Sequence, residues 1–196
     1  MSDLLFLTVS DVLEIHGEQI ELYGGDNGVR NPALLESALA VPQSGIGGEY
    51  FHVDIFDMAA AYLYHIVQNH PFVDGNKRTG LACAYLFLAI NGYELECDPD
   101  ELAEMVLGVA KGGMDKAGSL RSCGYTQSGE VSDHPKILAL FASAIKIDEN
   151  AEDDGQIINA AEQRNMVGYH IIGRDAIQKR SDNQRLFESR QLAVPE

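Results

Sequence analysis

Paired glycines and X-Pro steps divide the first 111 residues into short helical segments, and this punctuation limits the fold more than any other feature. Gly24-Gly25, Gly92 and Gly112-Gly113 each follow a run of apolar residues at helical spacing, as glycines do where helices end. Asn31-Pro32 and Asp98-Pro99 combine a capping side chain with a proline in the first turn, which is typical of helix starts. The chain is therefore expected to form an all-α domain.

Apolar periodicity places the expected elements between these signals. It predicts helices at about 9–23, 32–40, 53–68, 76–91 and 99–111. Residues 42–50 are rich in glycine and lack a helical period, which predicts a loop or a small hairpin. The expected architecture is an all-α domain with at most a small hairpin near residues 42–52.

The remainder of the chain has a different composition. Residues 112–134 are rich in Gly and Ser and read as a linker, and residues 135–146 have the pattern of one amphipathic helix. Beyond them the pattern is mixed and only weakly periodic. We therefore predict a helical domain over 1–115, and a linker and C-terminal extension of uncertain structure and role over 116–196.

Charge is unevenly distributed along the chain, whose formal net charge is −16. Residues 1–111 hold 17 acidic and four basic side chains, a net of −13, whereas the rest holds 13 and ten, a net of −3. Such an acidic chain is not expected to bind nucleic acid through a general basic face. Two of the four bases, Lys77 and Arg78, are adjacent. They form either an ordinary solvated pair or, against this background, a local site for an anion such as phosphate.

The sequence also predicts the surroundings of the protein. It contains no run of about 18 apolar residues, which a membrane span requires, and its first residues lack the basic and apolar regions of a signal peptide. The three cysteines, Cys83, Cys97 and Cys123, show no CxxC spacing and fit reduced thiols. We expect a cytoplasmic protein that does not bind membranes.

Residues 70–80 carry the chemistry of the chain, His-Pro-Phe-Val-Asp-Gly-Asn-Lys-Arg-Thr-Gly. The His70-Pro71 step interrupts a helical pattern, because the residue before a proline disfavours the helical conformation. A new helix is expected from about Asn76. A helix N-terminus presents backbone N–H groups and the positive end of the helix dipole, so it can hold an anion.

The residue types in this loop suit transfer of a phosphate-containing group. Asp74 would repel phosphate unless a cation lay between them, which indicates Mg²⁺. His70 could accept the proton of an attacking hydroxyl. Phosphate contacts are expected from Gly75, Asn76, Lys77 and Arg78. Taken one by one, these residues have simpler readings, since a histidine before a proline is usually a capping or core residue and Asp-Gly-Asn is usually a turn.

Taken as a unit, the string resembles the signature of the Fic/Doc family, His-x-Phe-x-Asp/Glu-Gly/Ala-Asn-x-Arg. The resemblance covers about residues 4–115 and is nearest to the compact Doc branch. It extends to Phe6-Leu7-Thr8 through His16, Tyr23-Gly24-Gly25, Arg30-Asn31-Pro32, Leu34-Leu35-Glu36, Leu86-Phe87-Leu88 and Asn91-Gly92. It implies a helical bundle whose β-hairpin flap, at residues 43–52, aligns a target segment by strand addition.

The resemblance also implies an activity and a set of roles. It implies a Doc-like toxin of a toxin–antitoxin pair, which uses ATP and Mg²⁺ to phosphorylate a Ser/Thr hydroxyl of a target protein, elongation factor Tu, and so inhibits translation. His70 would be the general base, and Asp74 the Mg²⁺ ligand. Gly75, Asn76, Lys77 and Arg78 would bind the nucleotide. Phe72 would be a core anchor.

Two alternatives differ at named positions. Fic enzymes that transfer AMP usually have glycine after the asparagine of the motif and a second arginine three residues after the first, where this chain has Lys77 and Leu81. These residues favour phosphoryl transfer. Doc has an arginine two residues before its histidine, where this chain has Gln68, and this departure favours a catalytically weak binding module. No complete Ser/Thr-x-x-x-Glu-Gly/Asn inhibitory motif occurs, so a separate antitoxin is expected.

Overall fold

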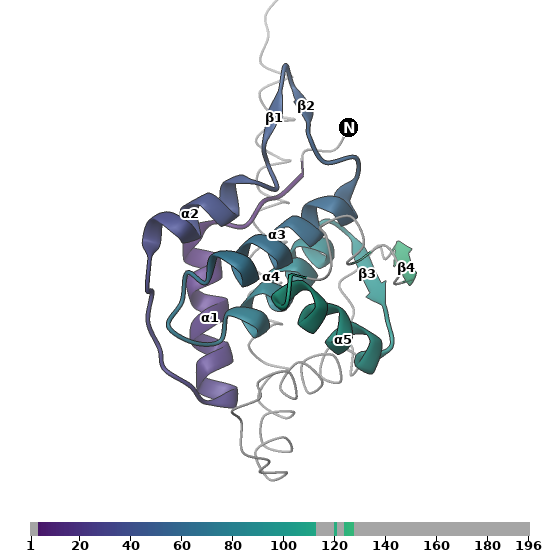
Figure 1. Ribbon diagram of the computed structural model, residues 1–196. Coiled ribbons are helices and arrows are strands. Elements are labelled where there is room, and N and C mark those ends of the chain that lie inside the picture. Colours follow the sequence, from purple (N-terminus) through teal and green to yellow (C-terminus); the bar gives the residue numbers. More distant parts are fainter. Residues whose placement is uncertain (1–3, 113–119, 121–123, 128–196) are drawn as a thin grey trace, which may run out of the picture.

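The computed structural model describes residues 4–112, 120 and 124–127, and this part of the chain is mainly helical (Figure 1). The predicted all-α class is confirmed, and the helix bounds differ by at most a few residues from those expected. The helices are α1 (Val9–Tyr23), α2 (Pro32–Ala40), α3 (Ile55–Asn69), α4 (Asn76–Ile90) and α5 (Pro99–Ala110).

Side-chain caps explain where most of these helices begin. Thr8 accepts a hydrogen bond from the Asp11 amide, while the Asp11 carboxylate accepts from the Thr8 amide, so α1 starts with a reciprocal capping box. Asn31 caps α2 and Asp98 caps α5, each followed by proline at the first helical position. Asp54 caps α3 with its side chain, without a proline after it. These local contacts satisfy amides that have no partner inside the helix.

The centre of the domain is a hairpin of two helices, α3 and α4. Every residue of α4 from Thr79 to Leu88 is buried, and α4 packs against α3 above all, and also against α1 and α5. Gly80 allows the close crossing, since a Cβ there would lie 3.1 Å from the Leu63 carbonyl oxygen of α3. Residues 70–75 form the turn of this hairpin, so the chemical motif is anchored to the most buried elements of the fold.

A small antiparallel hairpin projects from the helices at the top of Figure 1. Its strands are β1 (Gly45–Ile46) and β2 (Glu49–Tyr50), with Gly45 opposite Tyr50. The predicted hairpin is therefore confirmed. Ile46, Phe51 and Val53 are apolar side chains that lie exposed on it or beside it.

A second strand pair was not predicted. Strand β3 (Tyr93–Glu96) pairs antiparallel with β4 (Gly124–Gln127), and the Tyr125 ring lies 4.2 Å from that of Phe56. Leu120 is also part of the hydrophobic core. The segment read as a linker thus includes residues that pack on the helices. The division at residue 115 stays a prediction, and the helix expected at 135–146 lies outside the described residues.

The structure bears on two further expectations, the reduced state of the cysteines and the lack of a membrane span. Cys83 of α4 is a free, buried thiol, but Cys97, directly after β3, is disulfide-bonded. The expectation of three reduced thiols is therefore wrong, because disulfide formation depends on distances in the fold that sequence spacing does not show. Within the described part of the chain, none of the helices has both the length and the apolar character needed to cross a membrane.

Candidate active site

The motif loop, residues 70–75, begins and ends in the left-handed backbone region. His70 ends α3 with φ 47° and ψ 57°, and Gly75 precedes α4 with φ 73°. The His70 side chain is exposed, while Pro71, Phe72 and Gly75 are buried. The loop therefore presents His70 to solvent on a backbone that is otherwise packed into the domain.

The side chain of Asn76 closes the loop from within. Its Oδ1 accepts a hydrogen bond from the Phe72 amide at 3.0 Å, and its Nδ2 donates to the Phe72 carbonyl at 3.1 Å. Both residues are buried, with Phe72 only 1% exposed. Phe72 is thus the core anchor that the motif implied. Asn76 is a clamp on the loop, and a phosphate contact from its second N–H stays a prediction.

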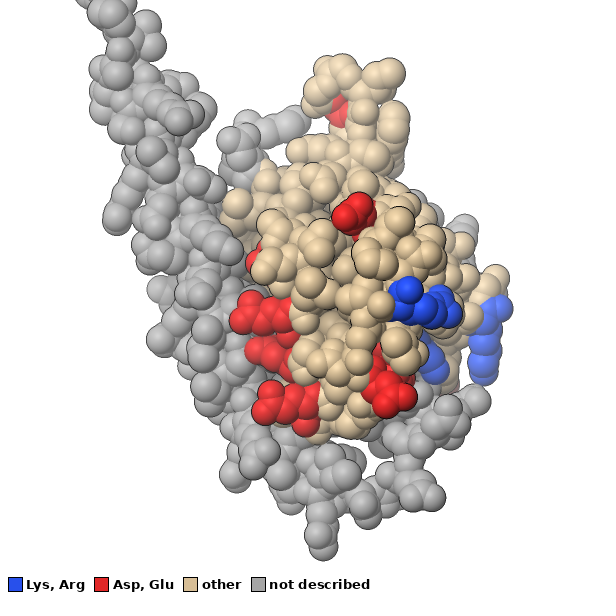
Figure 2. Space-filling model, turned by 90° about the vertical axis from the view of Figure 1, so that its left-hand side faces the viewer, with Lys and Arg blue, Asp and Glu red and all other residues tan. Residues whose placement is uncertain are grey.

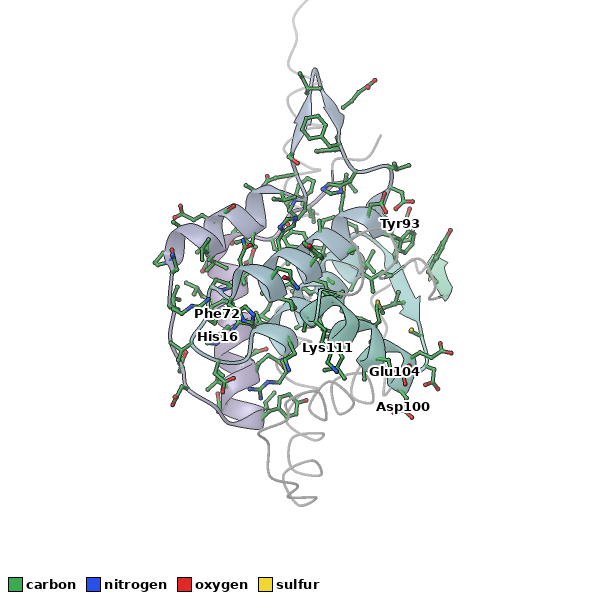
Figure 3. The ribbon with its side chains drawn as sticks, in the orientation of Figure 1. His16, Phe72, Tyr93, Asp100, Glu104 and Lys111 are labelled. Atoms are coloured by element: carbon green, nitrogen blue, oxygen red, sulfur yellow. The ribbon has the colours of Figure 1, made fainter. Side chains whose placement is uncertain are left out.

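Helix α1 supports the loop through His16. The imidazole stacks on Phe72 with ring centroids 3.9 Å apart and planes only 6° apart (Figure 3). Its Nε2 lies 3.1 Å from the carbonyl oxygen of Asp74. Because a carbonyl accepts, this nitrogen carries the proton. Burial, the largest cause, lowers the pKa of His16 below its ordinary 6.5, so the neutral ring is favoured.

The guanidinium of Arg78 lies at the C-terminal end of α1. Arg78 is 4% exposed, its Nη2 donates to the Gly24 carbonyl at 3.1 Å, and its Cζ lies 5.9 Å from the centre of the Tyr23 ring. A cation at the end of a helix stabilises carbonyls that lack a partner inside that helix. Arg78 therefore joins α4 to α1 and brings a positive charge beneath the loop.

Gly25 and Asp74 lie in direct contact. A Cβ added at Gly25 would lie 2.3 Å from Oδ2 of Asp74 and 3.2 Å from Nη2 of Arg78. The other carboxylate oxygen of Asp74 accepts a hydrogen bond from the Gly75 amide at 2.6 Å. Because a side chain at position 25 would displace the carboxylate, Gly25 determines where Asp74 can lie.

The first turn of α4 presents Lys77 beside the loop. The N-cap residue of α4 is Gly75, which has no side chain to cap the helix. No capping side chain therefore covers the backbone amides at the N-terminus of α4. Lys77 is partly exposed. The positive end of the helix dipole and Lys77 thus directly follow the loop, and both would favour an anion there.

Gln68 does not take part in the loop. Its Nε2 donates to the carbonyl of Val109 in the last turn of α5. The side chain that stands where Doc has an arginine therefore ties α3 to α5.

Charges of both signs lie on this side of the molecule, and acidic side chains also lie beside the basic ones. Figure 2 shows the Lys and Arg side chains near one another on the right of the face, while several Asp and Glu side chains gather on the left. Residues 1–111 contain four basic side chains, and three of them are near the motif loop. Lys77 and Arg78 belong to the motif, and Arg30 binds the carbonyl of Asn69 just before it. A strongly acidic chain thus keeps a local area suited to an anion.

The structure brings all the predicted site residues into one loop and the following helix turn, but it adds residues that the sequence analysis did not assign to the site. No role in the site was given to His16, Gly25 or Arg30. One signal could have identified His16. It falls between Val12, Ile15 and Gln19 on the apolar face of α1, and a polar side chain buried there requires a partner.

Known proteins match the part of the chain that forms this loop. Residues 6–88 match the model of the Fic/DOC family. The chain is 34% identical over 106 residues to "Protein kinase doc" of Escherichia phage P1, which covers 54% of this chain and 82% of the phage protein. It is 45% identical over 78 residues to "Toxin Doc" of Mycolicibacterium smegmatis, which covers 40% of this chain and 60% of that relative.

The contact between Gly25 and Asp74 gives a first prediction. Gly24→Ala and Gly25→Ala both place a Cβ on a backbone with positive φ, but only at position 25 would that Cβ meet Asp74 and Arg78. We expect Gly25→Ala to lower the free energy of unfolding by about 1–3 kcal/mol more than the control Gly24→Ala, as overpacking does. Urea denaturation of the two variants measures this difference, and equal losses would contradict the contact.

The buried imidazole gives a second prediction, on pH. Since the pKa of His16 is lowered in the folded state, its contribution to stability is complete above about pH 6.5 and is lost as the pH falls. Burial and the neighbouring Glu14 and Glu21 raise the pKa of Glu18 to about 7, which acts in the opposite direction. The wild type must therefore be compared with His16→Gln, which keeps an N–H donor but does not titrate.

We expect the free energy of unfolding of the wild type to decrease, relative to that of His16→Gln, as the pH falls below about 6.5. At neutral pH the variant should be less stable by about 0.5–1.5 kcal/mol, because the ring stack is lost. Denaturation curves across this range decide the matter. Parallel pH profiles would show that His16 is not held neutral.

Proposed function

Because the chain belongs to the Fic/Doc family, we propose that it is a Doc-like toxin that phosphorylates a Ser/Thr hydroxyl of a target protein with ATP. The observation that carries the proposal is the loop between α3 and α4. It brings an exposed histidine, a carboxylate, a helix N-terminus without a side-chain cap and a partly exposed lysine within one loop and the helix turn that follows it. The name "Protein kinase doc" of the phage relative supports phosphoryl transfer over AMP transfer.

The residues present fit Mg²⁺. Asp74 is a partly exposed carboxylate, and among the described residues no group of three or more His, Cys, Asp or Glu side chains could form a metal cage. Mg²⁺ is commonly held by one or two carboxylates together with nucleotide phosphates and water, so a single aspartate suits it. Asp74 would hold the ion, which would neutralise charge on the phosphates.

The reaction assigns a task to each side chain. The hydroxyl oxygen of the target attacks the γ-phosphorus of ATP, the bond to the leaving ADP oxygen breaks, and His70 accepts the hydroxyl proton. Lys77 and the first turn of α4 bind the phosphates. Arg78 adds positive charge from below, and Asn76 keeps the loop closed. The catalytic side chains are thereby held on a rigid helical hairpin.

The hairpin formed by β1 and β2 is proposed to bind the target. Its strands are two residues long and carry exposed apolar side chains. A short, open strand pair can accept a further strand from another protein through backbone hydrogen bonds. By resemblance the target is elongation factor Tu. We also propose a separate antitoxin as a partner, since one of the relatives is named as a toxin.

Intact-mass measurement of elongation factor Tu tests the proposal. After incubation with the full chain, ATP and Mg²⁺, we expect the target to gain the mass of one phosphoryl group. His70→Ala should be slower by roughly 10²–10⁴-fold, the usual effect of removing a positioned base. Nucleotide binding should persist in that variant.

The same spectrum separates the alternatives. A gain of one AMP would show the Fic-type adenylyl transfer instead, and an unchanged mass would favour a binding module. Full activity of His70→Ala would remove the histidine from the mechanism.

A further inference from the structure

The backbone of His70 is unusual in this fold. Within the described residues, His70 is the one non-glycine residue with a positive φ. Residues with a Cβ adopt this left-handed region only where surrounding contacts hold them, and such sites are often functional. The cause of this left-handed backbone is therefore to be sought in the groups that bind the peptide units beside His70.

Arg30 binds the peptide carbonyls on both sides of His70. Its Nη2 donates to the Asn69 carbonyl at 3.3 Å, and its backbone amide donates to the Pro71 carbonyl at 2.7 Å. The Asn31 amide adds a second bond to Pro71 at 3.0 Å. One residue thus ties down the chain immediately before and immediately after the exposed histidine.

The guanidinium meets a specific need of α3. Asn69 is the last residue of that helix, so its carbonyl has no partner within the helix. The last turn of α3 contains no basic residue of its own. Arg30 supplies from the preceding segment both the missing donor and the positive charge that a helix C-terminus favours.

Nearby pairing makes the segment around Arg30 a firm support. Val29 forms an isolated antiparallel bridge with Phe72, and the Val73 amide donates to the Gly28 carbonyl at 3.0 Å. Asn69 is held in turn, because its Nδ2 donates to the Leu34 carbonyl at 3.2 Å. Residues 71–73 of the motif loop are thus paired with residues 28–31.

We propose that Arg30 is the positioning residue for His70. In the part of the chain that the structure describes, no hydrogen bond to the His70 ring is found, so its direction is set by its backbone. Arg30 controls that backbone through the two carbonyls. The inference deepens the proposed function and rests on it, since it assigns to Arg30 the alignment of the base with the target hydroxyl.

A different role would leave a different kinetic signature. Arg30 is exposed, and a guanidinium has five N–H donors, so it could contact the nucleotide phosphates directly. A phosphate contact would mainly affect the KM for ATP, whereas a positioning residue affects kcat through His70.

Steady-state phosphorylation of elongation factor Tu by the full chain tests the proposal with two variants. Arg30→Met should lower kcat by about 10- to 100-fold, because misplacing a reacting group has effects of this size, with the KM for ATP within about twofold of wild type. Arg30→Lys should restore part of kcat, since it keeps the charge and a donor. In a His70→Ala background Arg30→Met should cause no further loss. A raised KM with unchanged kcat, or an equal loss in both backgrounds, would overturn the proposal.

A matched control separates positioning from stability. Asp98→Ala removes the N-cap of α5. The Asp98 carboxylate accepts from the Asp100 and Glu101 amides, and among the described residues no hydrogen bond joins it to the motif loop. It should lower the melting temperature, as Arg30→Met is expected to, and leave kcat unchanged. If it lowers kcat as much as Arg30→Met, the effect of Arg30 comes from stability alone and the proposal fails.

A measurement without turnover distinguishes failure of this inference from failure of the proposed function. In NMR spectra of the full chain without nucleotide, Arg30→Met should shift or broaden the His70 amide and ring signals, while Asp98→Ala should not. If the wild type transfers nothing from ATP, the proposed function fails, and these spectra still decide the role of Arg30. Unchanged His70 signals in Arg30→Met would refute it.

Discussion

The site depends on the contact between the C-terminal half of α1 and the loop that joins α3 to α4. His16 lies against Phe72 and donates to the carbonyl of Asp74, while Arg78 reaches back to the carbonyl of Gly24. The two contacts of His16 hold the motif loop, and the contact of Arg78 ties the first turn of α4 to the end of α1. Helix α4 is buried along most of its length. The loop is therefore held by α1 on one side and continues into a firmly packed helix on the other. Such support outside the reacting groups is what holds a site within the tolerance that catalysis requires.

Charge sets the second constraint. Residues 1–111 carry a net charge of −13, which would repel a nucleotide at long range, and less strongly as salt screens the charges. Three basic side chains offset this repulsion locally. Lys77 and Arg78 lie in the first turn of α4, and Arg30 lies beside the motif loop. The burial of Arg78 strengthens its field at the site, since a charge removed from water is screened less. A divalent ion on Asp74 would complete this local reversal of sign.

Local signals in the sequence predicted most of the elements, and long-range contacts account for the rest. Asn31-Pro32 and Asp98-Pro99 located helix starts because capping is decided within four residues. The pair β3–β4 was missed because its strands are far apart in the sequence and the second lies in a Gly/Ser-rich segment. The motif identified His70 and Asp74 as candidate site residues by their residue types. It could not show that the side-chain amide of Asn76 hydrogen-bonds the Phe72 backbone, or that Gly25 lies against Asp74. Those contacts exist only once α1 packs on the hairpin of α3 and α4.

Calorimetric titration of the full chain with ATP, in the presence and absence of Mg²⁺, tests the central claim most directly. The claim is that the loop between α3 and α4 is a site for ATP together with Mg²⁺ on Asp74. It predicts that the wild type binds ATP, that chelation of Mg²⁺ weakens this binding, and that Asp74→Asn loses most of the dependence on Mg²⁺. Binding of the same strength with and without the ion, or no binding of ATP at all, would contradict it.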